Sequence, residues 1–140
     1  MEKASRTLLR IAAIVGTVCG ALILACVPFL IVMGASTTIK EMLVAAINEG
    51  NVHSDLDLPP EEVAGIVQLV LIMTAVLLTM IGGLCVANAI ISSKARSNPT
   101  EGLMIASIIT GALTTDFSLV GGIFGMICIK RRARKKQLEE

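Results

Sequence analysis

The sequence predicts an all-α integral membrane protein built as a four-helix bundle, and two observations carry this prediction. Of the 140 residues, 54% are hydrophobic and only 16% are charged, whereas a soluble domain of this size has roughly a quarter of its residues charged. The apolar residues also lie in unbroken runs long enough to cross a bilayer, which takes about 20 residues of helix. We therefore expect one transmembrane domain, residues 1–140, with no separate soluble unit.

Four spans and one short amphipathic outer helix are expected. The spans are residues 8–34, 61–91, 99–115 and 116–131, and the outer helix covers residues 38–49. The three aromatic residues are all phenylalanines. Because single-stranded nucleic acids are usually bound by stacking on several aromatic rings, no nucleic-acid partner is expected.

The first run, residues 8–34, is preceded or opened by the basic residues Lys3, Arg6 and Arg10. As a helix its 27 residues would extend about 40 Å, which is enough to cross a bilayer with some tilt. The spacing Gly16-x-x-x-Gly20 leaves one stripe of this helix without side chains. We expect a neighbouring helix to approach closely there.

A second interpretation of the same segment is the signal peptide of a lipoprotein. Residues 23–26 read Ile-Leu-Ala-Cys, which resembles a lipobox after a basic start and an apolar stretch. Processing at that position would leave a lipidated Cys26 and remove everything upstream. Residues 27–33 remain apolar, whereas a processed lipoprotein normally turns polar, so a retained membrane helix is favoured.

The segment from Ser36 to Gly50 is too short and too polar to span. Its apolar and its charged residues fall on opposite faces of a helix, which predicts an amphipathic helix over 38–49. Thr38-x-x-Glu41 matches a capping box, and Gly50 suits the C-terminal stop. Such a helix lies in the membrane interface or folds over the outer end of the bundle.

An acidic loop follows and holds the one histidine of the chain, His53, together with Asp55 and Asp57. Carboxylates are ligands of hard cations, so these three residues are weak candidates for a structural metal site. Their spacing fits neither an EF-hand nor a zinc motif, and acidic loops are usually only solvated. No metal and no cofactor is therefore expected. Residues 59–62, Pro-Pro-Glu-Glu, indicate the start of the next helix.

The run over 61–91 is the longest in the chain. Its threonine hydroxyls can bond to carbonyl groups of their own helix, so only Gln68 and Asn88 need partners from elsewhere. We expect interhelical hydrogen bonds at both residues; the alternative is a polar site in a permeation path. Gly82 and Gly83 predict a close helix contact or a local bend.

A short basic loop with Lys94 and Arg96 is predicted over 92–98. The sequence Asn98-Pro99-Thr100-Glu101 then indicates a new helix, because it supplies an N-cap residue, a proline at the first position and an acid in the first turn.

The stretch from Leu103 to Ile129 permits two interpretations: one long span that buries Asp116, or two short helices joined at residues 114–116. Of the 12 basic residues, three lie at the N-terminus, two in 92–98 and six after Ile129, and basic groups of this kind face the cytoplasm. Only two crossings return the last group to that side. A single span would also bury Asp116 at a cost of about 2.5–3.5 kcal/mol.

We therefore predict four spans in an inner or plasma membrane, with both termini cytoplasmic. The turn at 114–116 would lie at the outer surface, where Asp116 caps the fourth helix. Each of the last two helices would reach only about 24–26 Å, so they must stand nearly upright or thin the bilayer. Ser107-x-x-x-Gly111 and Gly121-x-x-x-Gly125 supply small-residue stripes for tight helix contact.

The end of the chain, residues 121–132, has the form Gly-Gly-apolar-apolar-Gly and runs into a basic cluster. Ser5-Arg6-Thr7 precedes the glycine-bearing first helix, and Gly102 opens the third. In this placement of glycines and charges the chain resembles a family of small four-span prokaryotic membrane proteins of unknown function. The resemblance implies the four-helix arrangement and assigns no role to any residue.

No pattern of residues supports an enzyme: a nucleophile–base pair, a phosphate-binding glycine loop and metal spacing are all missing from the sequence. The favoured hypothesis is a structural or accessory membrane protein that contacts the lipid bilayer and packs with a membrane-protein partner or with itself. A second hypothesis is an oligomeric pore or small transporter lined by Gln68, Asn88 or Asp116. A third assigns lipid or partner contact to the basic tail; its residues are Lys130, Arg131, Arg132, Arg134, Lys135 and Lys136.

Overall fold

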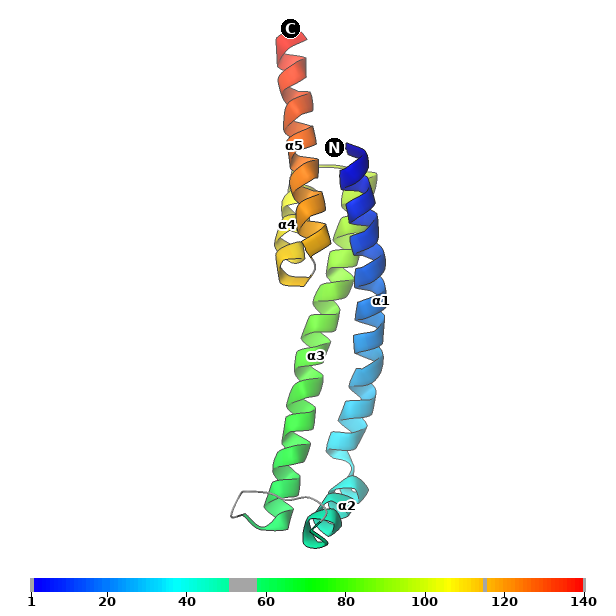
Figure 1. Ribbon diagram of the computed structural model, residues 1–140, viewed down its shortest axis with the longest axis vertical. Helices are drawn as coiled ribbons and strands as arrows, with labels where there is room; N and C mark the ends of the chain where they lie inside the picture. The colour runs from blue at the N-terminus through cyan, green and yellow to red at the C-terminus, as the bar shows by residue number, and fades with distance from the viewer. Residues whose placement is uncertain (1, 51–57, 115, 140) are drawn as a thin grey trace. The chain divides into compact units, whose positions relative to one another are not determined.

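The structure, a computed structural model, describes all residues except 1, 51–57, 115 and 140, and it describes residues 116, 138 and 139 by their backbone alone. The described residues form helices and no strand, which confirms the predicted all-α class. The helices, labelled in Figure 1, are α1 (Glu2–Ala35), α2 (Thr37–Asn48), α3 (Pro60–Ser97), α4 (Glu101–Thr114) and α5 (Asp116–Glu139).

Helices α1 and α3 are the long elements, with 34 and 38 residues. At 1.5 Å per residue they extend about 51 and 57 Å. Within the described residues, these two helices are long and apolar enough to cross a membrane, judged by length and composition. The shorter α4 is also apolar but has only 14 residues.

The predicted basic loop over 92–98 is wrong, because α3 continues as helix to Ser97. Lys94 and Arg96 lie in its last turn, where their positive charge interacts favourably with the negative end of the helix dipole and so stabilises the helix. The Ser97 hydroxyl donates to the Ser93 carbonyl oxygen over 3.1 Å and supports the same turn. The connection to α4 is therefore shorter than predicted, and α4 begins at Glu101 rather than at residue 99.

Helix α2 begins one residue earlier than predicted, and its cap is a different residue. Ser36, with an extended backbone, accepts a hydrogen bond from the Ile39 backbone N–H over 3.5 Å. Thr38, predicted as the cap, lies inside the helix instead. The predicted stop is confirmed: Gly50 has a φ of +72°, and its N–H bonds to the Ile47 carbonyl oxygen.

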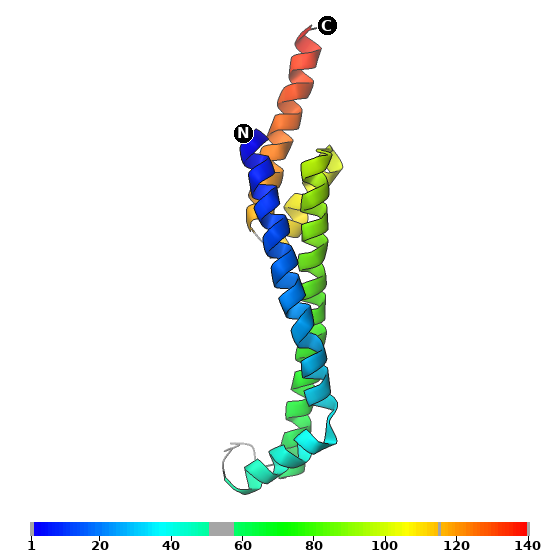
Figure 2. The same ribbon diagram turned by 90° about the vertical axis from the view of Figure 1, so that its right-hand side faces the viewer.

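The interpretation of residues 103–129 as two helices is confirmed. Helices α4 and α5 are separate and run antiparallel as a hairpin, as both views show (Figures 1 and 2). Helix α5 does not end near residue 131 but continues to Glu139. Basic side chains fill its C-terminal part, and positive charge there stabilises the negative end of the helix dipole.

The helices pack in two groups, residues 1–22 with 81–140, and residues 23–80. In the first group the core consists of Leu9, Ala95 and Met104, which come from α1, α3 and α4. Half-buried residues of α4 and α5 cover it. In the second group the end of α1, helix α2 and the start of α3 come together, and Gln68 of α3 donates to the Ser36 carbonyl oxygen over 2.8 Å.

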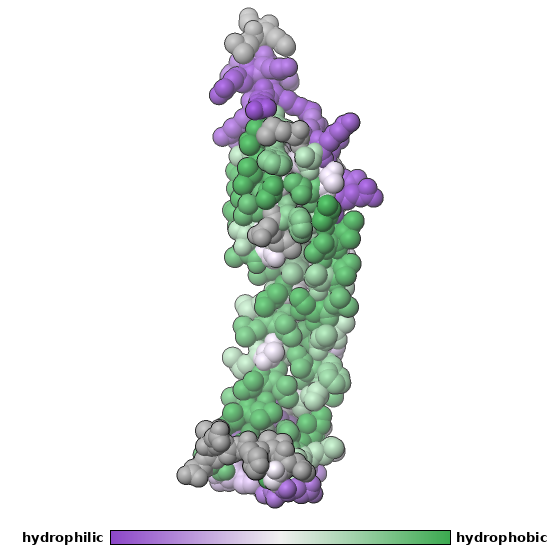
Figure 3. Space-filling view, viewed as in Figure 1, coloured by the Kyte–Doolittle hydropathy of each residue, from purple (hydrophilic) through white to green (hydrophobic). Residues whose placement is uncertain are grey.

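Large apolar side chains cover the outside of the long helices. Leu22 and Phe29 on α1 are 64% and 66% exposed, and Met80 on α3 is 66% exposed. Figure 3 shows the hydrophobic surface that such residues form, with hydrophilic residues gathered on the later part of α5 and on α2. Water-soluble monomers rarely expose large contiguous apolar surfaces.

Candidate functional site

The glycines of α1 lie against α3 in the first group. A Cβ atom at Gly16 would come within 2.9 Å of the Cys85 carbonyl oxygen, and one at Gly20 within 2.8 Å of a Val86 methyl group. Gly82 is buried, and its carbonyl oxygen lies 3.3 Å from that same position at Gly20. The predicted small-residue stripe of the first helix therefore makes a close helix contact.

Gly83 does not share in that contact. A Cβ atom there would meet nothing within 4 Å, so the residue lies on the open side of α3. The physical reason is helix periodicity: a step of one residue turns the side chain by about 100°, and Gly82 already occupies the face toward α1.

The glycines of the hairpin make the tightest contacts. A Cβ atom at Gly111 on α4 would overlap the backbone of α5 at Ser118 and Leu119. At Gly121 it would come within 3.1 Å of Leu9 on α1, and at Gly125 it would overlap the side chain of Met104. Small residues are therefore what allows the α4 and α5 backbones to approach each other.

A cluster of buried polar side chains joins α3, α4 and α5, and we call it the polar cluster. Its members are Asn88, Ser92, Ser107, Thr110 and Ser118. Asn88 is fully buried, and its Oδ1 accepts from the hydroxyls of Thr110 (2.9 Å) and Ser92 (3.5 Å). The Ser118 hydroxyl lies 3.1 Å from that of Ser92 and 2.8 Å from that of Ser107.

The polar cluster satisfies its own hydrogen bonds. Among the described residues, no buried side-chain nitrogen or oxygen is left without a partner. Burying a polar group without a partner is costly, so a satisfied network of this kind holds helices together. Gln68 likewise has a partner in the Ser36 carbonyl oxygen. Asn88 and Gln68 thus both bond to residues outside their own helix, as predicted.

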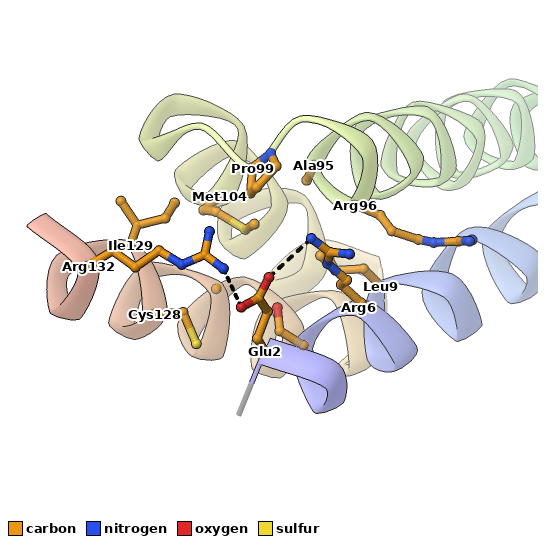
Figure 4. A pocket seen from close by; sticks show the side chains of 12 residues that line it. Glu2, Arg6, Leu9, Ala95, Arg96, Pro99, Met104, Cys128, Ile129 and Arg132 are labelled. Carbon is orange, nitrogen blue, oxygen red and sulfur yellow. Dashed lines mark hydrogen bonds and ion pairs between the residues drawn. The ribbon is translucent and has the colours of Figure 1, made fainter.

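At the N-terminal end of α1, one acid meets two arginines. Glu2 is bridged by Arg6, one helical turn along α1, at 3.1 Å, and by Arg132 of α5. Figure 4 shows both guanidinium groups directed at the Glu2 carboxylate, whereas Arg96 extends away from it. All three paired side chains are 43–65% exposed, so each bridge contributes about 1 kcal/mol or less.

Beneath Glu2 lies a cavity of about 30 Å³. It is lined mainly by apolar side chains, among them Leu9, Met104 and Ile129 (Figure 4). A volume of this size holds about one water molecule. It is therefore a small packing void between helices and is too small to hold a substrate.

The remaining predicted site residues are less constrained. The basic tail is exposed along α5, with Arg132 in the pair described above. Two exposed arginines elsewhere, Arg10 and Arg96, line a cleft that the sequence did not indicate. The weak metal candidates His53, Asp55 and Asp57 lie outside the described residues, as does the side chain of Asp116 with its predicted capping role.

Sequence reasoning missed most of the polar cluster. Asn88 was singled out and Ser107 was predicted to pack, but Ser92, Thr110 and Ser118 were not. The available signal was the recurrence of small hydroxyl residues at 107, 110 and 118 within an apolar stretch. The hydrogen bond from the Ser5 hydroxyl to the Gly121 carbonyl oxygen, 2.8 Å long, joins residues 116 positions apart and gave no local signal.

Comparison with known protein families, with curated proteins and with solved structures finds no match for this chain.

Proposed function

We propose that this chain is a small integral membrane protein of structural or accessory type, which packs with a membrane partner or with a second copy of itself. The observation that carries the proposal is the exposure of its apolar helices. In the most hydrophobic 18-residue windows of α1 and α3, only 17% of the residues are buried. A core helix of a soluble protein would instead be covered by its own fold.

Lipid is the surrounding that suits these two helices. Moving a fully exposed side chain such as Phe or Met from water into an apolar environment is favourable by about 1.5–3 kcal/mol of transfer free energy. Phe29 and Met80, which are largely exposed, would gain much of this in lipid. The backbone polar groups of a helix are satisfied internally, which is what the bilayer core requires. Both helices exceed the roughly 30 Å of hydrocarbon that a span must cross.

The lipoprotein alternative fits the contacts less well. Removal of the residues before Cys26 would also remove Gly16 and Gly20, which lie against α3, and Ser5, which bonds to Gly121. A segment that is discarded after processing has no need of such contacts. A retained first span uses all of them.

Charge supports the orientation of the protein. The basic residues of the N-terminus, of the end of α3 and of α5 belong to the first group, and Glu2 pairs with Arg6 and Arg132 there. The positive-inside rule favours this set in the cytoplasm. Both termini would then be cytoplasmic.

The α4–α5 hairpin could either cross the whole bilayer, which gives four spans, or turn inside it. Thr110 bonds to Asn88, so Thr114 lies about one turn beyond, near residue 84 of α3. Residue 84 is about 15 Å from Lys94 along the helix, roughly half of the hydrocarbon thickness. These lengths favour a hairpin that enters from the cytoplasmic side and turns inside the bilayer. The four-span version would require local thinning. Both versions keep the termini on the same side.

A pore or small transporter is the alternative function. It would need polar groups available to a passing solute, whereas Asn88 and Gln68 are occupied by Thr110 and Ser36. Flux of ions or small solutes through liposomes that contain the protein, abolished by Asn88→Leu, would favour the pore over the accessory role.

Two experiments test the proposal. Membranes that contain the full chain are washed with alkaline carbonate, which releases peripheral proteins; the proposed integral protein stays in the pellet. The protein is then isolated in mild detergent and its mass is measured by light scattering. A stoichiometric complex with a partner or a second copy is expected, and a lone monomer at all concentrations would contradict the accessory role.

A further inference from the structure

Three arginines line one open cleft at the basic end of the first group. The cleft has a volume of about 400 Å³ and is lined by Arg6, Thr7 and Arg10 of α1 and by Arg96 and Ser97 of α3. Guanidinium groups bind phosphate well, because their fork of N–H groups donates paired hydrogen bonds to two phosphate oxygens. The cleft thus offers positive charge from two helices to one anion.

Most of this charge is not neutralised by the protein. The ion pairs recorded in the described part join Glu2 to Arg6 and Glu2 to Arg132. Neither involves Arg10 or Arg96. Two arginines that share a cleft without an acid repel each other, and an anion placed between them relieves that repulsion.

An apolar groove lies between the same two helices, next along the chain on both. It has a volume of about 690 Å³. Its lining residues are Ala13, Ile14, Thr17 and Val18 of α1 and Val86, Ala89, Ile90, Ser93 and Lys94 of α3. Residues four apart lie on the same face of a helix. Arg10, Ile14 and Val18 follow each other at this spacing on α1, and Ala89, Ser93 and Ser97 do so on α3, so the cleft and the groove share one face of each helix.

The groove presents hydrocarbon in spite of its hydroxyl residues. The Thr17 hydroxyl donates to the Ala13 carbonyl oxygen of its own helix over 2.8 Å. Ile14 and Ile90 are 55% and 52% exposed along it. An acyl chain could replace water along the apolar side chains of this surface.

We propose that this face binds one anionic phospholipid of the cytoplasmic leaflet. Its phosphate is held by Arg6, Arg10 and Arg96, and an acyl chain lies in the groove between α1 and α3. Basic pockets between membrane helices on the cytoplasmic side are suited to anionic headgroups. The proposal rests on the membrane insertion proposed above, and it goes beyond the basic tail, because the tail contributes no residue to the cleft.

The test uses the full chain in mild detergent, with phosphatidylglycerol and phosphatidylcholine offered at equal concentration and bound lipid counted by native mass spectrometry. We expect phosphatidylglycerol to bind and phosphatidylcholine to bind much less. The double variant Arg10→Gln, Arg96→Gln should weaken phosphatidylglycerol binding about thirtyfold, which corresponds to about 2 kcal/mol for two basic side chains.

Matched variants separate charge from shape. Arg134→Gln with Lys136→Gln removes the same charge from the tail and should leave binding within about threefold. Ser93→Phe keeps every charge but fills the groove, and it should reduce binding of the lipid. Glycerol 3-phosphate, which has no acyl chain, should not bind at the same concentration.

Equal binding of both lipids, or unchanged binding in the Arg10, Arg96 variant, would overturn the proposal. Unchanged binding in Ser93→Phe would overturn the acyl-chain part and leave an anion site only. Circular dichroism is used to check that each variant is helical. If the Gln variant does not fold, the variant Arg10→Lys, Arg96→Lys replaces it; this variant keeps the charge and should retain the lipid preference. Carbonate extraction of the same variants keeps the two proposals apart. If the Arg10→Gln, Arg96→Gln variant remains in the membrane and binds lipid as the wild type does, the lipid site alone is refuted.

Discussion

Thr110 of α4 donates a hydrogen bond from its hydroxyl to the Oδ1 atom of Asn88 on α3, over 2.9 Å. The same hydroxyl lies 2.9 Å from the Ala106 carbonyl oxygen of its own helix. This pair fixes the height at which the α4–α5 hairpin meets α3. It also places the buried amide of Asn88 among hydroxyl groups.

Replacement of Asn88 by leucine should destabilise the protein. The hydroxyls of Ser92 and Thr110 lose an acceptor, and interhelical hydrogen bonds in membrane proteins contribute about 0.6 kcal/mol on average and up to about 1.7. We expect a loss of about 1–2 kcal/mol, measured as a lower midpoint of thermal unfolding by circular dichroism in detergent. Thr74→Val is the control, because the exposed Thr74 hydroxyl bonds only to the Val70 carbonyl oxygen of its own helix. Equal midpoints for Asn88→Leu and wild type would show that the cluster does not hold the helices.

Two single-methyl changes test the glycine contacts. Gly111→Ala should cost about 1–3 kcal/mol, because its Cβ would overlap the α5 backbone, which cannot rotate away as a side chain can. Gly83→Ala adds the same methyl group where nothing lies within 4 Å, and it should be neutral or stabilising by up to about 1 kcal/mol. The same unfolding assay compares them. A larger loss at Gly83 than at Gly111 would be incompatible with the described helix contacts.

The Glu2 pairs should matter little for stability. All the side chains concerned are largely exposed, and exposed ion pairs contribute about 0–1 kcal/mol. In a double-mutant cycle of Glu2→Gln with Arg132→Gln, the coupling free energy should stay below about 1 kcal/mol and shrink as salt is added. A coupling of several kcal/mol that is independent of salt would indicate a buried pair instead.

The depth of the hairpin has a separate test. In a variant whose four native cysteines are replaced by alanine, a cysteine is placed at position 114. If the hairpin turns inside the bilayer as proposed, this cysteine should be protected from an impermeant thiol reagent on both sides of the membrane. Labelling from outside intact cells would instead establish four complete spans.

Composition was enough to predict an all-helical chain, and glycine spacing predicted the contacts of Gly16 and Gly20. The distribution of charge predicted that residues 103–129 form two helices. Local signals misplaced helix ends. The sequence predicted a loop at Lys94 and Arg96, although basic side chains also stabilise the last turn of a helix, where both residues lie. The pairing of Ser92 with Ser118, and of Glu2 with Arg132, depends on how distant segments meet, and no local spacing encodes it.

In the proposed topology the protein crosses the membrane and keeps both ends in the cytoplasm. Single cysteines at Glu49 and Lys136 in the cysteine-free variant, probed with an impermeant maleimide on intact cells, test this topology. We expect labelling of Glu49→Cys without permeabilisation and of Lys136→Cys only after it. Labelling of Lys136→Cys on intact cells, with Glu49→Cys protected, would contradict it.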